Sequence, residues 1–185
     1  MTKTALFGGS FDPIHFGHIN LAIEMLEKHG LDKVLFCPVY QNPLKDQKPT
    51  EEHHRLEMLR IAIADIPQFE ILEWELQQKG LSYTVATLEH LSHQYKNLYL
   101  IMGSDSQASF TQWKDWEKIE RLATVLAAPR DPEAPNGGRF RVLEVSSTEL
   151  RERIRKGLYC EHLMPKNVLD YIRSHQLYLS PDYAD

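Results

Sequence analysis

Short apolar runs alternate with amphipathic helical patterns along most of this chain, and that alternation limits the fold more than any other feature. The expected strands cover residues 4–7, 34–39, 69–72, 98–102, 124–127 and 140–145, and the expected helices cover residues 19–29, 51–65, 83–95 and 113–122. The apolar runs are rich in β-branched and aromatic residues, as buried strands are. A strand, a helix and a second strand in succession form a right-handed crossover, which makes the two strands parallel and lays the helix over the sheet. The sequence therefore predicts an α/β fold, a doubly wound Rossmann-like parallel sheet with helices on both faces.

The C-terminal part of the chain carries two further helical patterns, at residues 147–157 and 165–177. They predict a small C-terminal helical segment. The 185 residues are expected to form one domain, residues 1–185, whose helical part covers 146–180. Two segments rich in proline, glycine and polar residues are expected to be loops: residues 41–50 and 128–139.

The charge balance and the hydropathy narrow the classes of protein. The chain has 26 acidic and 21 basic residues, a net charge of −5, which argues against a general nucleic-acid-binding surface. No apolar run approaches the roughly 20 residues that cross a bilayer, and the N-terminus resembles a first strand rather than a signal peptide. Cys37 and Cys160 stand outside any C-x-x-C pattern, so both are expected to be reduced thiols, Cys37 as a small buried hydrophobe. These features favour a cytoplasmic protein.

The segment GGSFDPIHFGH, residues 8–18, joins the first expected strand to the first expected helix. Gly8 and Gly9 lack side chains, so the turn is expected to adopt positive φ and to bring backbone N–H groups close to a ligand. The N-terminus of the helix favours an anion. His15 and His18 can face that anion across Gly17, where a side chain would obstruct the approach, and can donate N–H bonds to phosphate oxygens. Taken alone, the two histidines fit ordinary helix capping or metal contacts better than they fit phosphate binding.

A second motif, SSTELR, lies at residues 146–151. Hydroxyl groups at the start of a helix can cap it and can donate to an anion, and here they are Ser146, Ser147 and Thr148. Arg151 and Arg155, one turn apart, would add positive charge on one face. In isolation the same residues fit a capped helix with solvated arginines better than an anion site.

Together, the two motifs resemble the signatures of the nucleotidyltransferase superfamily that carries H-x-G-H. Further segments are similar to the nicotinate mononucleotide adenylyltransferase family: NPLK with Lys45, HHRLEMLRIAI at 53–63, SYTVATLEHL at 82–91 and IMGSDSQASFTQWKDWEKI at 101–119. The resemblance extends over residues 4–177. It implies transfer of AMP from ATP to nicotinate mononucleotide, giving nicotinate adenine dinucleotide and pyrophosphate in NAD biosynthesis, with Mg²⁺ bound mainly through the ATP phosphates and no dedicated metal ligands.

The resemblance also assigns residues. The catalytic set is His15, His18, Lys45 and Arg151. The ATP-binding set is Gly8, Gly9, Ser10, Phe11, His15, Gly17, His18, Gly103, Asp105, Ser146, Ser147, Thr148 and Arg151. The set for nicotinate mononucleotide is Gly9, Ser10, Phe11, Lys45, Thr84, Trp113 and Lys114.

Several residues also have simpler interpretations. Trp113 and Trp116 fit the core equally well, Asp105 fits a helix cap, and Asp12 is expected to brace its own turn through backbone bonds. The histidines His53, His54, His90 and His93 are expected to lie on solvated helix faces. The family usually shows Arg-Pro-Gly after the fifth strand, whereas this chain reads APRDPEAP, so Arg130 is given no role.

Alternative functions stay open at this point. Nicotinamide mononucleotide or phosphopantetheine could be the acceptor, or the chain could bind nucleotides as a sensor without turnover. A nucleic-acid-binding module is disfavoured by the acidic charge balance. A homo-oligomer is compatible with the sequence.

Overall fold

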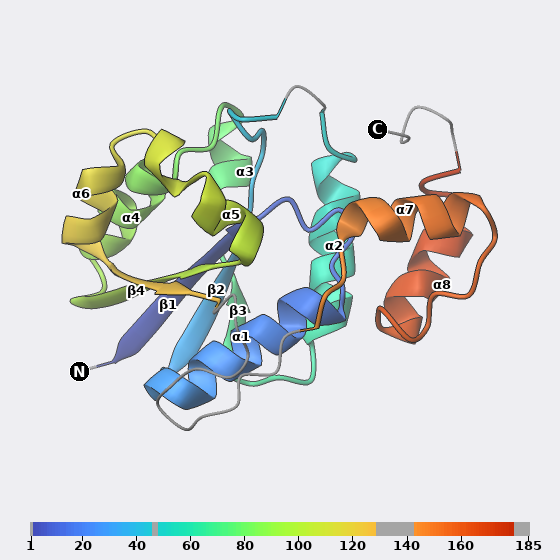
Figure 1. Ribbon diagram of the computed structural model, residues 1–185, viewed down its shortest axis with the longest axis horizontal. Coiled ribbons are helices and arrows are strands. Elements are labelled where there is room, and N and C mark those ends of the chain that lie inside the picture. Colours follow the sequence, from blue (N-terminus) through green and yellow to red (C-terminus); the bar gives the residue numbers. More distant parts are fainter. Residues whose placement is uncertain (1, 46–47, 129–142, 180–185) are drawn as a thin grey trace.

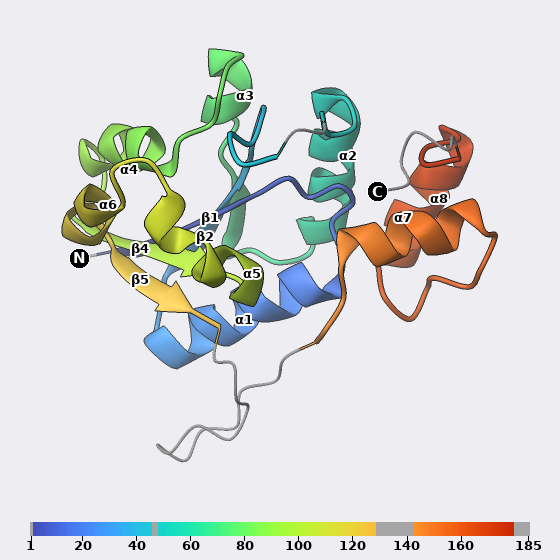
Figure 2. The same ribbon diagram turned by 45° about the horizontal axis from the view of Figure 1, so that its top comes forward.

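The computed structural model describes residues 2–45, 48–128 and 143–179, and its centre is a five-stranded parallel sheet (Figures 1 and 2). The strand order is β3-β2-β1-β4-β5, and all four pairings are parallel. This confirms the predicted doubly wound α/β fold. The strands are β1 (Lys3–Gly9), β2 (Lys33–Pro38), β3 (Phe69–Ile71), β4 (Asn97–Met102) and β5 (Thr124–Ala127). The helices are α1 (Phe16–His29), α2 (Glu52–Ile63), α3 (Trp74–Gln78), α4 (Thr84–Ser92), α5 (Ser104–Ala108), the 3₁₀ turn η1 (Phe110–Gln112), α6 (Trp116–Leu122), α7 (Ser147–Arg155) and α8 (Lys166–Ser174).

The order of strands reverses at β1. From β1 the chain adds β2 and β3 on one side, then crosses over to add β4 and β5 on the other. In the register, Leu6 of β1 lies between Leu35 and Leu100. Open α/β sheets bind ligands beyond the carboxyl ends of the strands at such a switch point. The loop after β1, which carries the two histidines, begins there.

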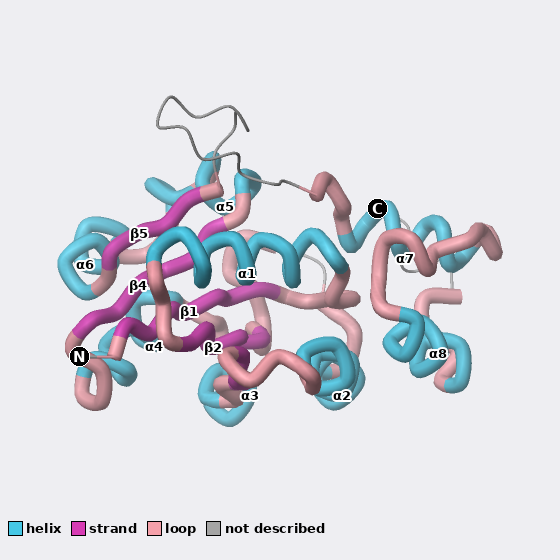
Figure 3. The backbone as a smooth tube through the Cα atoms, turned by 90° about the horizontal axis from the view of Figure 1, so that it is seen from below, coloured by secondary structure: helices cyan, strands magenta, loops and turns pink. Residues whose placement is uncertain are grey.

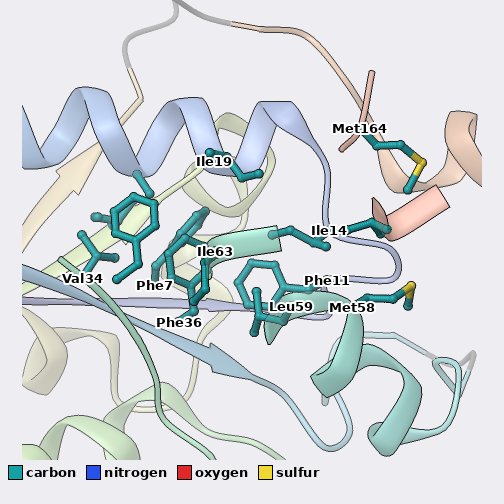
Figure 4. Close-up of a cluster of buried hydrophobic side chains, with 14 of the residues drawn as sticks. Phe7, Phe11, Ile14, Ile19, Val34, Phe36, Met58, Leu59, Ile63 and Met164 are labelled. Carbon is teal, nitrogen blue, oxygen red and sulfur yellow. The ribbon is translucent and has the colours of Figure 1, made fainter. Parts of the chain in front are cut away.

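The two faces of the sheet bury two separate cores. Along β1, Ala5 and Phe7 point into one core, while Leu6 points into the other. The first core contains residues of α1 and α2, and Figure 4 shows side chains of β1, β2 and both helices converging there. The second core contains residues of α4 and α6. Helices therefore cover both faces, as the alternating pattern predicts.

The C-terminal helices α7 and α8 lie beyond one end of the sheet, where α8 contacts α2 (Figures 1 and 3). Leu150, Cys160, Met164 and Val168 are buried in the first core together with residues of β1 and β2. The start of α7 is thus fixed against the same core as the loop after β1.

The structure departs from the expected elements in two places. No strand forms at 143–145 in the described chain, and the remainder of that expected strand, together with most of the loop predicted at 128–139, lies outside the described residues. Residues 143–145 instead lead directly into the cap of α7. The short helices α3 and α5 were missed, because five residues are too few to show a helical period. No helix in the described part of the chain is long and apolar enough to span a bilayer.

Candidate active site

A cavity of about 1500 Å³ opens at the switch point. The ends of β1 and β4, the loop after β2 and the starts of α1, α4, α5 and α7 all contribute to its wall. Every predicted site residue whose side chain the structure describes lines this cavity: Gly8, Gly9, Ser10, Phe11, His15, Gly17, His18, Lys45, Thr84, Gly103, Trp113, Lys114, Ser146, Ser147, Thr148 and Arg151. The fold therefore brings together residues that are up to 143 positions apart in sequence, Gly8 to Arg151.

The glycines of the first motif act differently from the prediction. Gly8 and Gly9 belong to β1, and neither has positive φ; Phe11 takes the left-handed conformation instead, with φ of 47°. A Cβ atom on Gly9 would lie 3.0 Å from Cζ of Phe11. Glycine at this position therefore makes room for the buried Phe11 ring, and the expectation of a positive-φ glycine turn is wrong.

His15 is the N-cap of α1, and its ring is stacked on that of His18 with a centroid distance of 3.6 Å. The backbone N–H of His18 donates to Nδ1 of His15 at 3.3 Å. Because Nδ1 accepts, a neutral His15 ring carries its proton on Nε2. The capping interpretation is therefore correct for His15 and leaves Nε2–H free to serve as a donor at the cavity.

Both imidazoles are neutral at pH 7. Burial lowers the pKa of His15 to about 4, and burial also lowers the pKa of His18 well below its usual value, with smaller effects from His15 and from the charge of Lys45. Nδ1 of His18 is buried and has no partner in the described residues, so Nε2 is the nitrogen of His18 that a ligand can reach. The edge of the Phe11 ring packs against His18 at a centroid distance of 5.1 Å and fixes its position.

Gly17 separates the two histidines and is confined from both sides. A Cβ atom there would lie 3.0 Å from Cε1 of His15 and 3.0 Å from the backbone oxygen of Leu143. A side chain at residue 17 would therefore clash first with the His15 ring and with the backbone of the segment that leads to α7. Gly17 allows the loop before α7 to approach the start of α1.

The SSTELR motif, residues 146–151, forms the cap and the start of α7. Ser146 caps the helix by accepting from the backbone N–H of Glu149 at 3.1 Å, and Ser147 Oγ donates to the Pro13 carbonyl at 3.0 Å. Arg151 donates through Nη1 to the Asp12 carbonyl at 3.0 Å and through Nη2 to Thr148 Oγ1 at 3.2 Å. These contacts hold the start of α7 against the loop after β1.

Arg155 does not belong to the site. Its guanidinium pairs with the carboxylate of Glu152 at 2.8 Å on an exposed face of α7, outside the cavity wall. The expectation that Arg151 and Arg155 act on one face is therefore wrong for Arg155. One turn of helix is enough to separate a residue in the cavity from one on the surface.

A second wall of the cavity is formed by the start of α4 and the segment before α6. The helix α4 begins at Thr84 with no side-chain cap and no acidic residue in its first turn, so its first N–H groups are available to an anion. Trp113 is half-buried; it packs against the second core, as the core interpretation predicts, and it also lines the cavity. Nζ of Lys114 lies 4.6 Å from the centre of the Tyr83 ring. Trp116 does not line this cavity.

Glu75 lies beneath this wall and was missed by the sequence analysis. It is only 5 % exposed, and its Oε1 accepts from Thr87 Oγ1 at 2.6 Å. Burial raises the pKa of Glu75, and its hydrogen bonds with Thr87, Ser82 and Cys37 oppose that shift. Since Ser82 and Thr87 flank Thr84, the carboxyl group fixes the start of α4 beside the cavity.

The charged residues of the wall favour anions. Among the described lining residues, the cationic side chains are Lys45, Lys48, Lys114 and Arg151, and the carboxyl groups are those of Asp12 and Glu75, both buried. The cavity is thus locally cationic although the whole chain carries a charge of −5. Lys48 was not predicted; it lies three residues beyond Lys45 in the same loop.

Some predictions fall outside the cavity or outside what is described. Asp105 lies within α5, whose cap is Gly103, so the capping interpretation of Asp105 is wrong; its side chain and Arg130 lie outside the described residues. His53, His90 and His93 are exposed, as predicted, with His90 stacked on Trp74; His54 is half-buried, and its Nδ1 lies 2.9 Å from the Tyr171 hydroxyl. Both cysteines are buried free thiols. No cluster of three or more His, Cys, Asp or Glu side chains suited to a metal occurs among the described residues.

This fold, with two neutral imidazoles and the start of a capped helix around a cationic cavity, defines a nucleotide-binding α/β protein of the nucleotidyltransferase class. The family model described as cytidylyltransferase-like matches residues 6–153. A relative from Methylacidiphilum infernorum that carries the name nicotinate-nucleotide adenylyltransferase is 35% identical, over 96% of this chain and 92% of its own length. The chain therefore belongs to the nicotinate-nucleotide adenylyltransferase family, as its motifs predict.

Solved structures share the fold. A Vibrio parahaemolyticus structure described as a nicotinate-nucleotide adenylyltransferase has a TM-score of 0.77 at 23% identity and covers 97% of both chains. The Plasmodium falciparum nicotinic acid mononucleotide adenylyltransferase complexed with NaAD has a TM-score of 0.71 at 20% identity, over 96% of this chain and 98% of that one. Both are similar to this chain over its full architecture.

Proposed function

We propose that this protein transfers AMP from ATP to nicotinate mononucleotide, giving nicotinate adenine dinucleotide and pyrophosphate, a step in NAD biosynthesis. The observation that carries the proposal is one cavity with two anion-binding walls: the histidine pair facing α7, and the uncapped start of α4 beside Trp113. The family membership supports the same reaction.

The reaction needs no protein nucleophile. An oxygen of the 5′-phosphate of nicotinate mononucleotide attacks the α-phosphorus of ATP, the bond from that phosphorus to the bridging oxygen of the β-phosphate breaks, and pyrophosphate leaves with the electron pair. Because the attacking phosphate is already anionic, the protein contributes alignment and stabilisation of charge. We assign that stabilisation to His15, His18, Lys45 and Arg151.

The neutral state of the imidazoles suits this role. A neutral imidazole carries one N–H, and in His15 that N–H is on Nε2, so the ring can donate to a phosphate oxygen while its Nδ1 keeps accepting from the backbone N–H of His18 at the cap of α1. Such donors are most effective where charge develops in the transition state. We assign the α-phosphate to His18 and the β- and γ-phosphates to the start of α7 with Arg151.

A divalent cation fits this site only as a partner of the phosphates. The described wall offers carboxyl groups at Asp12 and Glu75, and both residues are buried; both oxygens of Asp12 accept hydrogen bonds and Oε1 of Glu75 accepts one from Thr87, so phosphate oxygens and water would supply most ligands to Mg²⁺. When bound, Mg²⁺ would neutralise charge on the triphosphate.

The acceptor is proposed to bind at the second wall. Thr84 and the free N–H groups of α4 suit the carboxylate of the pyridine ring, and Trp113 offers a flat apolar face for the ring itself. Gly9, Ser10 and Phe11, with Lys45 and Lys114, complete the proposed contacts with nicotinate mononucleotide. Ser10 and Gly103 are proposed to face ATP.

The experiment that tests the function is pyrophosphate release from ATP and Mg²⁺ with three acceptors offered separately: nicotinate mononucleotide, nicotinamide mononucleotide and phosphopantetheine. Nicotinate mononucleotide should win by about 100-fold in kcat/KM, nearly 3 kcal/mol of discrimination. Preference for another acceptor would refute the assignment of Thr84 and Trp113. Tight ATP binding with no release for any acceptor would favour a sensor, and strongly salt-dependent binding to oligonucleotides would favour a nucleic-acid module.

Two expectations about the cell stay predictions. The protein is expected in the cytoplasm, and a homo-oligomer is compatible with the sequence. Cell fractionation tests the first, and light scattering after size-exclusion chromatography tests the second.

A further inference from the structure

Asp12 connects three distant segments of the chain. Its carboxylate, in a residue that is 6 % exposed, accepts from the backbone N–H of Thr50 at Oδ2, at 3.0 Å, and from the Tyr178 hydroxyl at Oδ1, at 2.7 Å. Its backbone oxygen accepts from Arg151 Nη1 at 3.0 Å. These donors are 38, 166 and 139 positions away in sequence. The expectation that Asp12 braces its own turn is therefore wrong.

Arg55 joins two of the same segments a second time. It lies on α2, is 1 % exposed, and donates through Nε to the Thr50 carbonyl at 2.7 Å and through Nη1 to the Ser10 carbonyl at 2.9 Å. A buried guanidinium requires hydrogen-bond acceptors and a nearby negative charge, and the carboxylate of Asp12 favours its charged form. The loop after β1 is thus tied to Thr50 by a carboxylate and by a cation.

Each connected segment carries residues that line the cavity. Ser10 and Phe11 lie in the loop after β1, Lys45 and Lys48 precede Thr50 in its own loop, and Arg151 projects from α7. Tyr178 itself does not line the cavity; it is 1 % exposed and follows α8. A residue with no access to substrate therefore bonds the carboxylate at which the three segments meet.

We propose that Asp12, Arg55 and Tyr178 are positioning residues that fix the phosphate-facing loop, the Lys45 loop and α7 in one geometry, so that the C-terminal Tyr178 sets the ATP site from outside it. The kinetic effects expected from this positioning role rest on the proposed function, whereas its expected effect on ATP binding does not. The Tyr178 hydroxyl acts through Asp12, on the geometry at His15 three residues further on. Displacement of reacting groups by about 1 Å can cost on the order of 100-fold in rate.

The test compares Tyr178→Phe with Tyr171→Phe. Tyr171 lies on α8, pairs its hydroxyl with His54 Nδ1 at 2.9 Å and does not line the cavity, so each change deletes one phenolic hydroxyl that has a partner. Both variants are compared with the wild type in thermal unfolding, in ATP affinity by calorimetry without acceptor, in kcat and KM for ATP, and in hydrogen exchange at the Thr50 amide. Tyr178→Phe should weaken ATP binding and lower kcat, each by about tenfold or more, and speed exchange at Thr50. Tyr171→Phe should leave kcat and ATP affinity within about twofold.

Loss of thermal stability in Tyr178→Phe with wild-type ATP affinity and kcat would overturn the proposal and leave a purely structural role. Should Tyr178→Phe not fold, Arg55→Lys serves in its place, because it keeps the charge and removes the fork that spans Thr50 and Ser10; unchanged ATP affinity in that variant would also overturn the proposal. The calorimetry separates this proposal from the function, since it uses no acceptor. If no acceptor reacts but ATP binding still depends on Tyr178, the function fails and the positioning role stands.

Discussion

Acid should destabilise this protein through the buried histidine at the start of α1. The pKa of His15 is about 4 in the folded state, against 6.5 in the unfolded chain. A group whose folded pKa is lowered stabilises the fold fully above the unfolded value, and this stabilisation is lost as the pH falls from 6.5 through 4. Between pH 7.5 and 5.0, the contribution of His15 to the free energy of unfolding should fall by about 2 kcal/mol. His18 acts in the same direction, because burial lowers its pKa too.

The measurement is urea unfolding at several values of pH for the wild type and for His15→Asn. Asparagine keeps a side-chain acceptor for the cap of α1 but does not titrate. The variant should therefore lose about 2 kcal/mol less than the wild type over this pH range. An equal loss in both proteins would show that His15 does not cause the acid sensitivity, as would an NMR titration that places the pKa of His15 at 6.5 or above.

Three further substitutions test separate parts of the site. Gly17→Ala should destabilise the fold by about 1–3 kcal/mol, because the new methyl group meets the His15 ring and the Leu143 oxygen at 3.0 Å; an unchanged urea midpoint would contradict this. Trp113→Ala should raise KM for nicotinate mononucleotide about tenfold and leave KM for ATP nearly unchanged in steady-state kinetics, whereas equal changes in both would argue against ring stacking. Lys45→Met should lower kcat/KM about tenfold through loss of a charge-assisted contact, and a wild-type value would remove Lys45 from the catalytic set.

The sequence predicted the central strands well because they are buried on both faces. Residues 5–7 of β1 and 34–37 of β2 are apolar whichever way a side chain points, so a short continuous run is enough to indicate a strand. The two motifs that line the cavity were also found, because helix starts and glycine loops have local signatures.

What could not be predicted depends on contacts across the fold. No residue near Asp12 in the sequence indicates its hydrogen bond with Tyr178, 166 residues away. Glu75 lies in a helix too short to show a helical period. The role of Gly9 depends on the Phe11 ring, for which it leaves room. The backbone of Phe11 itself takes the left-handed conformation that was expected of a glycine. Local patterns locate the site, whereas its supporting contacts come from packing.

The role proposed for His18 is tested most directly by the rate of AMP transfer to nicotinate mononucleotide by His18→Ala at saturating substrates, beside a check of folding by circular dichroism. If His18 donates to charge that develops at the α-phosphate, kcat should fall by about 100-fold or more while the fold is retained. A folded His18→Ala protein with an unchanged kcat would contradict the assignment of the histidine pair to the chemistry.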